Sequence, residues 1–354
     1  MIKLPGLIDV HVHLRDPGQT YKEDFFTGTS SALAGGFITI LDMPNNKIPI
    51  TSIKTLEEKQ KIASQKIVCD VGFYAGSLGE NLEKLVKMEP YVFGLKLYLN
   101  KTTGNFIIDE EKLKRIFTFW KSSKPILVHA ESDMIGKVIQ QAEKYQKKIH
   151  ICHVSTKFEL KTIIKAKKKG LSITCGVTPH NLFLSWNDAD KLGPFGLMKP
   201  EIEKGYKEFL WENLNWIDVI ESDHAPHTIE EKNHPPAGEK PPFGVPGLET
   251  TLPLLLTAVS EKKLSINRLI ELCFENPKKI FNIKTDNNTW IEVDEKEKYI
   301  INNKNLKTKC GWSPFNGWKV KGKIIRVFIR GKMVFENGKL LVKPGFGKVI
   351  KPAL

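Results

Sequence analysis

Residues 7–43 read LIDVHVHLRDPGQTYKEDFFTGTSSALAGGFITILDM, two apolar runs separated by a segment of helical length. Leu7–Leu14 and Phe37–Met43 are rich in aliphatic and β-branched residues, as expected of strands that are buried on both faces. Asp24–Ala34 lies between them and has the length and pattern of a helix. A strand, a helix and a second strand in this order predict a parallel βαβ unit.

The same alternation continues to about residue 260. Further strands are expected at Val68–Tyr74, Phe93–Leu99, Ile126–His129, His150–Val154, Ser172–Val177 and Asp218–Ser222. Further helices are expected at Ile53–Ser64, Glu110–Lys121, Met134–Tyr145 and Lys157–Lys168. About eight strands in one run favour a closed (β/α)8 barrel of the TIM type over an open sheet. A dinucleotide-binding fold has no support, because no strand is followed by Gly-x-Gly-x-x-Gly.

The character of the sequence changes after about residue 285. Short alternating strands are expected at Ile324–Arg330, Lys332–Glu336 and Leu340–Val342, with a turn at Asn337-Gly338. We therefore predict two parts: a barrel over residues 1–285 and a small β subdomain over residues 286–354 that packs on it.

Composition limits the class of protein. The chain is 41% hydrophobic, and none of its apolar runs reaches the roughly 18 to 20 residues that cross a bilayer. Five cysteines without close pairs do not form a disulfide framework. We expect no signal peptide, no membrane partner and a cytoplasmic location.

The net charge of +14 raises nucleic acid as a partner. The lysine clusters lie on apparently helical stretches, where solvated faces are the usual explanation, and no nucleic-acid-binding motif accompanies them. We therefore expect no nucleic-acid partner. The positive field could also speed the encounter with anionic substrates.

Polar residues stand where several of the apolar runs end. His11 and His13 are two apart on one strand, so their imidazoles point to the same face and could bind one ion. Taken alone, the pair could equally be two core histidines. His129, His153 and Asp223 also end apolar runs, where a barrel gathers its functional groups.

Lys96 lies inside the apolar run Phe93–Leu99. A charged lysine buried without a partner costs several kcal/mol. Carboxylation by CO₂ would turn this amine into an anionic carbamate that can bridge two cations. Together with the four histidines and the aspartate, it would complete a two-metal hydrolytic centre.

This set of residues, in this order, resembles the amidohydrolase superfamily. The surrounding motifs are similar to those of dihydroorotases, above all to the dihydroorotase domain of the multifunctional animal pyrimidine-synthesis protein. The motifs are Gly6–Gly18, Lys22–Phe25, Met43–Asn45, Gly94–Tyr98, His129–Glu131, Ile151–Val154, Ser222–His227, Pro246–Thr250 and Lys319–Gly322. They extend over almost the whole chain.

The resemblance implies a zinc-dependent, reversible cyclisation of N-carbamoyl-L-aspartate to L-dihydroorotate in pyrimidine biosynthesis. One zinc would bind His11, His13 and Asp223, the other would bind His129 and His153, and carboxylated Lys96 would bridge the two. A hydroxide between the metals would attack the ring amide, and Asp223 would serve as general acid and base.

The resemblance also implies a set of substrate-binding residues. Arg15, Asn45 and His227 would hold the substrate carboxylate, although Arg15 could instead form a structural ion pair. The Pro246-Gly247 backbone would face the ring. The loop after Lys96 has Thr102 and Thr103 but lacks the phenylalanine of the animal form, so the two hydroxyls would contact the substrate. Lys199 stands where the animal form has an arginine.

Two alternatives to this function remain open, and the assembly of the protein is a separate expectation. A hydantoinase or an allantoinase shares the metal residues, but an allantoinase usually has asparagine in place of Arg15. A degenerate copy could act as a scaffold that binds an aspartate transcarbamoylase, although such a copy is expected to lose metal ligands. A homodimer is common among related enzymes.

Overall fold

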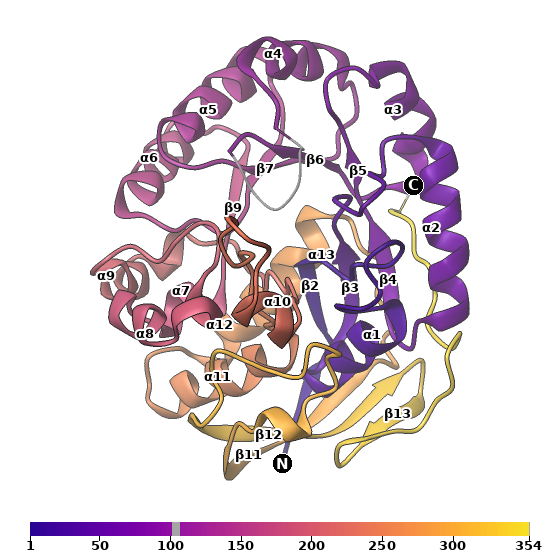
Figure 1. The fold of residues 1–354 in the computed structure, drawn as a ribbon, viewed down its shortest axis with the longest axis vertical. Helices are drawn as coiled ribbons and strands as arrows, with labels where there is room; N and C mark the ends of the chain where they lie inside the picture. Colours follow the sequence, from indigo (N-terminus) through magenta and orange to yellow (C-terminus); the bar gives the residue numbers. More distant parts are fainter. Residues whose placement is uncertain (101–106, 354) are drawn as a thin grey trace.

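The computed structural model describes residues 1–100 and 107–353. Its parallel strands form a closed barrel inside a ring of helices, which confirms the predicted (β/α)8 fold (Figure 1). The strands are β2 (Leu7–Val12), β3 (Phe37–Asp42), β4 (Asp70–Phe73), β5 (Ala75–Gly76), β6 (Leu95–Tyr98), β7 (Ile126–His129), β8 (Ile149–Ile151), β9 (Ile173–Val177) and β10 (Val219–Ile220). The strands expected from the sequence include all of these except β5, and most of their ends are one to three residues too long.

Two contacts join the parallel sheets β2-β3-β4 and β5-β6-β7-β8-β9-β10. On one side β4 and β5 follow each other along the chain, so that β4 pairs in the first sheet and β5 in the second. There the Phe93 amide donates a hydrogen bond to the Phe73 carbonyl at 2.9 Å. On the other side Val12 bridges His224, and the His13 amide donates to the His224 carbonyl at 2.8 Å. The barrel therefore closes where the first strand meets the chain after the last one.

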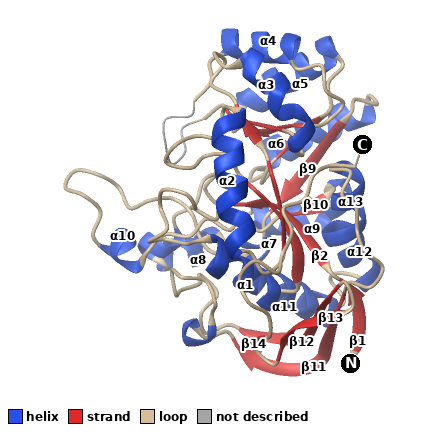
Figure 2. Cartoon of the chain, turned by 90° about the vertical axis from the view of Figure 1, so that its right-hand side faces the viewer, coloured by secondary structure: helices blue, strands red, loops and turns tan. Residues whose placement is uncertain are grey.

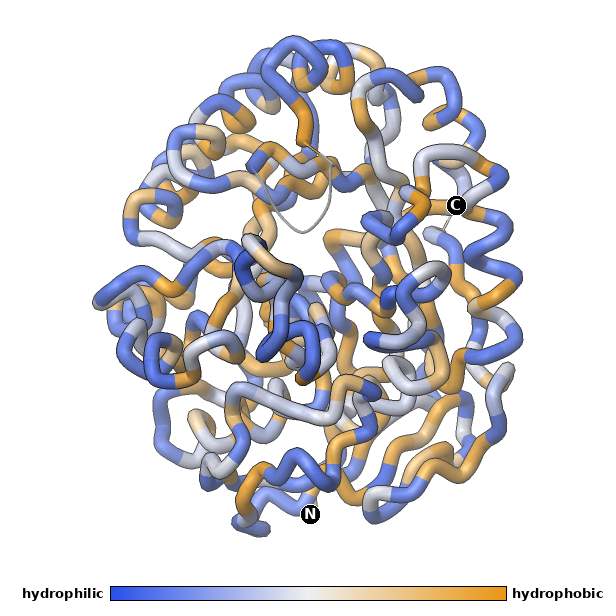
Figure 3. The backbone as a smooth tube through the Cα atoms, in the orientation of Figure 1, coloured by the Kyte–Doolittle hydropathy of each residue, from blue (hydrophilic) through white to orange (hydrophobic). Residues whose placement is uncertain are grey.

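The helices cover the outside of the barrel. Those between strands are α1 (Phe25–Ala34), α2 (Ile53–Lys66), α3 (Leu82–Met88), α4 (Glu110–Phe119), α5 (Asp133–Tyr145), α6 (Lys157–Lys168), α7 (Pro179–Phe183), α8 (Trp186–Lys191) and α9 (Tyr206–Glu212). After β10 follow α10 (Ile229–Asn233), α11 (Leu248–Ser260), α12 (Ile266–Ile270) and α13 (Asn276–Ile280). Asp24, Ser52 and Thr156 form capping boxes, which explains where α1, α2 and α6 begin. In Figure 3 the strands are mostly hydrophobic and the outer turns of the helices hydrophilic, as an outer helical layer requires.

A five-stranded antiparallel sheet lies at one side of the barrel (Figure 2). Its strands are β1 (Ile2–Pro5), β11 (Trp290–Ile300), β12 (Lys319–Ile329), β13 (Lys332–Glu336) and β14 (Lys339–Leu340). The strands expected from the sequence include neither β1 nor β11, which pair with each other in the register Leu4–Ile291. The division into two parts at residue 285 stays a prediction. The sheet itself includes β1, so it draws on both ends of the chain.

The chain returns from this sheet to the barrel. Arg330 Nη1 donates to both carboxylate oxygens of Asp70 at 2.9 and 2.7 Å, and the Val71 amide donates to the Lys348 carbonyl at 2.9 Å. In the part of the chain that the structure describes, no helix combines the length and the apolar character needed to cross a bilayer.

The contact between α1 and α11 gives a test of the packing. A methyl group on Gly35 would lie 2.1 Å from the carbonyl oxygen of Leu248, which is fixed backbone at the start of α11. Gly35→Ala should therefore lower the free energy of unfolding by about 1–3 kcal/mol, as overpacking does. Urea denaturation measures the change.

Gly136 in α5 provides the matched control, because nothing lies within 4 Å of the methyl group that alanine would add. Gly136→Ala should stabilise the protein by roughly 0.5–1 kcal/mol through helix propensity. Equal effects of the two substitutions would contradict the close approach at Gly35.

Candidate metal centre

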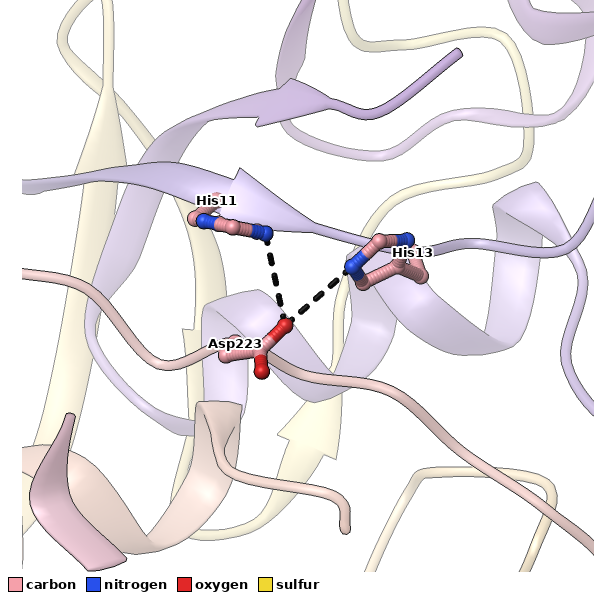
Figure 4. A group of neighbouring side chains, drawn as sticks. All are labelled: His11, His13 and Asp223. Atoms are coloured by element: carbon pink, nitrogen blue, oxygen red, sulfur yellow. Dashed lines mark hydrogen bonds and ion pairs between the residues drawn. The ribbon is translucent and has the colours of Figure 1, made fainter. Parts of the chain in front are cut away.

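Three donor groups meet where the barrel closes (Figure 4). His11 belongs to β2, His13 follows that strand, and Asp223 follows β10. Asp223 Oδ1 lies 3.4 Å from His11 Nε2 and 3.1 Å from His13 Nε2. One ligand atom from each residue lies within 4.8 Å of the others, and all three residues are buried, so the group could hold one metal ion.

Two further histidines lie beside this group. His129 ends β7 and His153 follows β8, and His129 Nδ1 lies 3.0 Å from His153 Nε2. The rings of His11 and His153 are 5.1 Å apart, so the two groups are neighbours. His129 Nδ1 and His153 Nε2 are thus the two nitrogens that face each other, and two neutral imidazole nitrogens this close could bind one shared metal ion.

Lys96 lies on β6 and is completely buried. Its Nζ donates to Cys152 Sγ at 3.0 Å, and among the described residues it forms no ion pair with a carboxylate. After burial itself, the positive charge of Lys96 is the next largest cause of the lowered pKa of His11. The amine therefore lies close to the histidines, as a ligand of the same centre would.

The protonation states of these groups suit a metal. Burial lowers the pKa of His11 to about 4 and lowers the pKa values of His13, His129 and His153, so the imidazoles are neutral near pH 7. Burial by itself would raise the pKa of Asp223, but the neighbouring His11 and the hydrogen bond from His13 hold it well below its usual range. Neutral imidazoles and an ionised carboxylate are the forms that bind metals.

Glu221, which was not predicted from the sequence, contacts two of the candidate ligands, His11 and His153. Its Oε2 lies 3.4 Å from both His11 Nδ1 and His150 Nε2, and its Oε1 accepts a hydrogen bond from the His153 amide. Gly176 leaves the room for it, since a methyl group there would lie 2.5 Å from the carboxylate. The one sequence signal was a glutamate directly after an apolar strand.

Glu221 also fixes the form of His11. A carboxylate facing Nδ1 favours a proton on that nitrogen and leaves the Nε2 lone pair directed toward Asp223. Burial opposes the charge on Glu221, yet His11 and His150 hold its pKa well below the usual range. Glu221 is therefore an anion that orients a candidate ligand.

Arg15 and Asn45 line the same cavity as the histidines and Asp223. Asn45 Oδ1 lies 2.7 Å from His13 Nδ1, and Arg15 Nη2 lies 3.3 Å from His227 Nε2. An arginine can only donate, so His227 Nε2 accepts this hydrogen bond, and Lys22 Nζ lies 3.1 Å from His227 Nδ1 on the other side of the ring. His227 is fully buried and does not line the cavity in the described structure, so its contact is with Arg15.

The remaining predicted substrate residues are distributed unevenly. Lys199 lines the cavity, together with Tyr98, Phe243 and Gly244, which sequence reasoning did not single out. Pro246 and Gly247 are buried just before α11, where the Gly247 amide donates to His224 Nδ1 at 3.2 Å, and neither lines the described cavity. Thr102 and Thr103 lie outside the described residues.

A second, larger chamber of about 950 Å³ adjoins the cavity. The two spaces share Lys199 and Phe243 in their linings, so these residues lie where the cavity and the chamber adjoin. The larger chamber also has Glu131, whose Oε1 lies 3.1 Å from His129 Nε2. Lys199 and Phe243 therefore form a wall that the two spaces share.

Comparison with known proteins identifies the family. Residues 2–180 match the Amidohydrolase family. The chain is 37% identical over 372 residues to a protein named dihydroorotase from Pyrococcus horikoshii, covering 99% of this chain and 85% of that protein. The chain belongs to the dihydroorotase family. Dihydroorotases of the amidohydrolase family are metal-dependent, and the His11, His13 and Asp223 group is a candidate site for the metal.

The multifunctional protein CAD of Squalus acanthias is 44% identical to this dihydroorotase-family chain over 354 residues. The match covers 99% of this chain and only 16% of that protein, so the chain corresponds to about one sixth of this multifunctional relative.

Two solved structures show the same fold. The L-hydantoinase (dihydropyrimidinase) of Arthrobacter aurescens has a TM-score of 0.94 at 26% identity, covering 99% of this chain and 89% of that one. The inactive dihydroorotase-like domain of the CAD-like multifunctional protein of Chaetomium thermophilum has a TM-score of 0.82, also at 26% identity, covering 99% of both chains.

Glu221 gives a test of the metal centre. Glu221→Gln removes the charge that orients His11, so the affinity for zinc should fall about 10- to 100-fold, the usual effect of losing such a partner. Zinc titration of the metal-free protein measures the affinity.

Glu159→Gln is the matched control. Glu159 is also a buried carboxylate and accepts hydrogen bonds from the Ser132 and Ser155 amides at 2.9 and 3.0 Å, but it contacts none of the histidines. This variant should lose stability and keep its zinc affinity. Unchanged zinc affinity in Glu221→Gln would show that Glu221 does not orient a ligand.

Proposed function

We propose that this chain is a dihydroorotase that interconverts N-carbamoyl-L-aspartate and L-dihydroorotate in pyrimidine biosynthesis. The observation that carries the proposal is the position of Arg15, whose guanidinium lines the same small cavity as the candidate metal ligands. A substrate with a carboxylate beside a cyclic amide needs a cation at one end and hydrolytic groups at the other. The names of the relatives of at least 30% identity agree with this activity.

We further propose that the metal is zinc and that two ions are bound. His11, His13 and Asp223 would hold one, His129 and His153 would hold the other, and a carboxylated Lys96 would join them. Bound zinc would supply Lewis-acid activation of the amide carbonyl and of water. The buried and neutral histidines, the facing nitrogens of His129 and His153 and the position of Lys96 among them all fit this assignment.

Asp223 would move the proton. Its carboxylate is ionised and lies at the edge of the cavity, so it can accept a proton from the attacking water. It would then return that proton to the ring nitrogen as the amide bond breaks. In the direction of cyclisation the same carboxylate removes the proton from the attacking nitrogen.

Arg15 and Asn45 would orient the substrate. The guanidinium can bind a carboxylate through two hydrogen bonds, and His227 keeps it in place by accepting a third. Asn45 presents its amide beside His13. We keep as proposals that His227 belongs to the carboxylate clamp, that Pro246 and Gly247 face the ring, and that Thr102, Thr103 and Lys199 contact the substrate.

A hydantoinase is the rival enzyme, because its fold is so similar. Hydantoin has no ring carboxylate, so the buried Arg15 would then have nothing to bind. A scaffold without activity is the other rival, and one structural neighbour is described as inactive. Against it stands the complete set of candidate ligands in this chain, which a degenerate copy has no reason to keep.

The setting of the enzyme is also a proposal. The five cysteines are buried free thiols, which suits a reducing cytoplasm. The multifunctional relatives support an aspartate transcarbamoylase as a neighbour in the pathway, and a homodimer is the expected assembly.

Ring opening of dihydroorotate by the purified protein, followed in the ultraviolet, tests the function. Hydantoin and allantoin are assayed in parallel, and zinc is counted in the same sample. We expect turnover of dihydroorotate alone, with about two zinc ions per chain, as a two-metal centre requires. Turnover of hydantoin alone would identify a hydantoinase, and bound zinc without any turnover would favour the scaffold.

Arg15→Gln tests the carboxylate clamp. Loss of a charged hydrogen bond typically costs about 1.5–3 kcal/mol, so KM for dihydroorotate should rise roughly 10- to 100-fold while kcat changes less. Metal content, measured on the same preparation, should stay the same. A KM equal to that of the unchanged enzyme would mean that Arg15 has a structural role only.

A further inference from the structure

Lys232 is a buried lysine outside the site described above. It belongs to α10, in the group of helices and loops that projects from one end of the barrel, and its side chain is 0% exposed (Figure 2). Its Nζ donates to the carbonyl oxygens of Pro242 at 2.7 Å and of Leu197 at 3.2 Å. The two acceptors lie 45 residues apart in the sequence, so this one amine joins two distant segments.

Each of the two segments carries one residue of the wall that the cavity and the larger chamber share. Lys199 follows Leu197 by two residues, and Phe243 follows Pro242 directly. The Lys199 amine lies 5.2 Å from the centre of the Phe243 ring. The Gly244 amide donates to the same Leu197 carbonyl at 3.0 Å, so the segments are bound to each other as well as to Lys232.

Trp312 supports the other side of Lys232. The Lys232 amine lies 5.5 Å from the centre of the Trp312 ring, and the indole Nε1 donates to the His227 carbonyl at 2.7 Å. His227 in turn contacts Arg15. Trp312 thus contacts Lys232 and also binds the backbone of His227, the residue that contacts Arg15.

Stability alone does not explain a lysine here. Burial lowers the pKa of Lys232 to about 7, which measures how unfavourable the charged form is in this position. Among the described residues it forms no ion pair with a carboxylate, and a buried polar group of this kind is often replaced by an apolar one without loss of stability. A methionine has a side chain of similar length but no hydrogen-bond donor, so it could not bind the two carbonyls.

We propose that Lys232 is a positioning residue that fixes the wall formed by Lys199 and Phe243, and that it thereby controls substrate binding rather than the chemical step. Lys232 touches neither the metal ligands nor the cavity. The predicted effect on KM rests on the proposed function, because that function names the substrate. The hydrogen bonding of the wall can be measured without any substrate.

Lys232→Met tests the proposal, because it keeps the length of the side chain and removes both hydrogen bonds. KM for dihydroorotate should rise about ten-fold, the size expected for two ordinary hydrogen bonds, while kcat and the zinc content stay within about three-fold. Equal falls in kcat and in zinc content would overturn the proposal, as would an unchanged KM.

Lys167→Met is the matched control. Lys167 is also mostly buried, and its Nζ donates to the Trp216 carbonyl at 2.7 Å and pairs with Asp218, far from the cavity. This variant should lose thermal stability without a change in KM. A ten-fold rise of KM in the control would show that any loss of a buried lysine has this effect, which would also overturn the proposal.

Hydrogen exchange of the metal-loaded protein without substrate separates this proposal from the proposed function. The Gly244 amide, bonded to Leu197, should exchange at least about ten-fold faster in Lys232→Met than in the unchanged chain, while amides of α5 stay protected. If Gly244 exchanges equally in both, Lys232 does not hold the wall. If the unchanged chain does not turn over dihydroorotate, the proposed function fails and the exchange result still stands.

A second variant covers the case in which Lys232→Met does not fold. Lys232→Gln keeps one amide group as a donor but is shorter, so it can satisfy at most part of the pair of carbonyls. It should show the same separation of KM from kcat and the same faster exchange of Gly244. Normal KM and normal exchange in this variant would overturn the proposal.

Discussion

The contact of Asp223 with His11 and His13 is the interaction on which the rest of the structure depends. It lies at the point where the barrel closes, beside the bond from the His13 amide to the His224 carbonyl. The first strand and the chain after the last strand therefore meet through the same residues that could bind a metal. Closure of the fold and assembly of the site are one event, because a barrel that failed to close would separate Asp223 from both histidines.

The site is also where the backbone departs from regular geometry. Arg15, His153 and Asp223 all have positive φ angles, of 61°, 37° and 44°. Such conformations cost non-glycine residues about 1–3 kcal/mol each, so the surrounding structure has to hold them. Glu221 helps to hold the His153 backbone by accepting a hydrogen bond from its amide, and at Arg15 the carbonyl accepts a hydrogen bond from the Gln19 amide at 3.0 Å. The strands end two or three residues before these positions, and the turns then direct the side chains inward.

The sequence allowed the barrel and most of the candidate site to be predicted because both are local signals. An apolar run that ends in histidine or aspartate can be recognised without any partner, and His129 lies at the last residue of its strand as expected. Contacts between distant segments left no such signal. The pairing of Ile2–Pro5 with β11, the fit of Glu221 into the space at Gly176, and the two carbonyls at Lys232 each join residues that only the folded chain brings together. The placement of Pro246 and Gly247 at the ring stays a prediction, and the described cavity is lined by Phe243 and Gly244 of the same loop.

The buried lysines give a last argument about the centre. Lys22, Lys59, Lys96 and Lys232 are all buried. Lys22 pairs with Glu231, Lys59 pairs with Asp42 and donates to the Met43 carbonyl, and Lys232 donates to two carbonyls. Lys96 alone among these has a sulfur, a weak acceptor, as its hydrogen-bond partner in the described structure. In the described structure, Lys22, Lys59 and Lys232 thus have oxygen acceptors for their amines, whereas Lys96, which lies among the histidines, does not. A carbamate on Lys96 would remove the unfavourable positive charge and place an anion beside the neutral histidines, where cations could bind. The poorly partnered amine of Lys96 is therefore what the proposed two-metal centre requires.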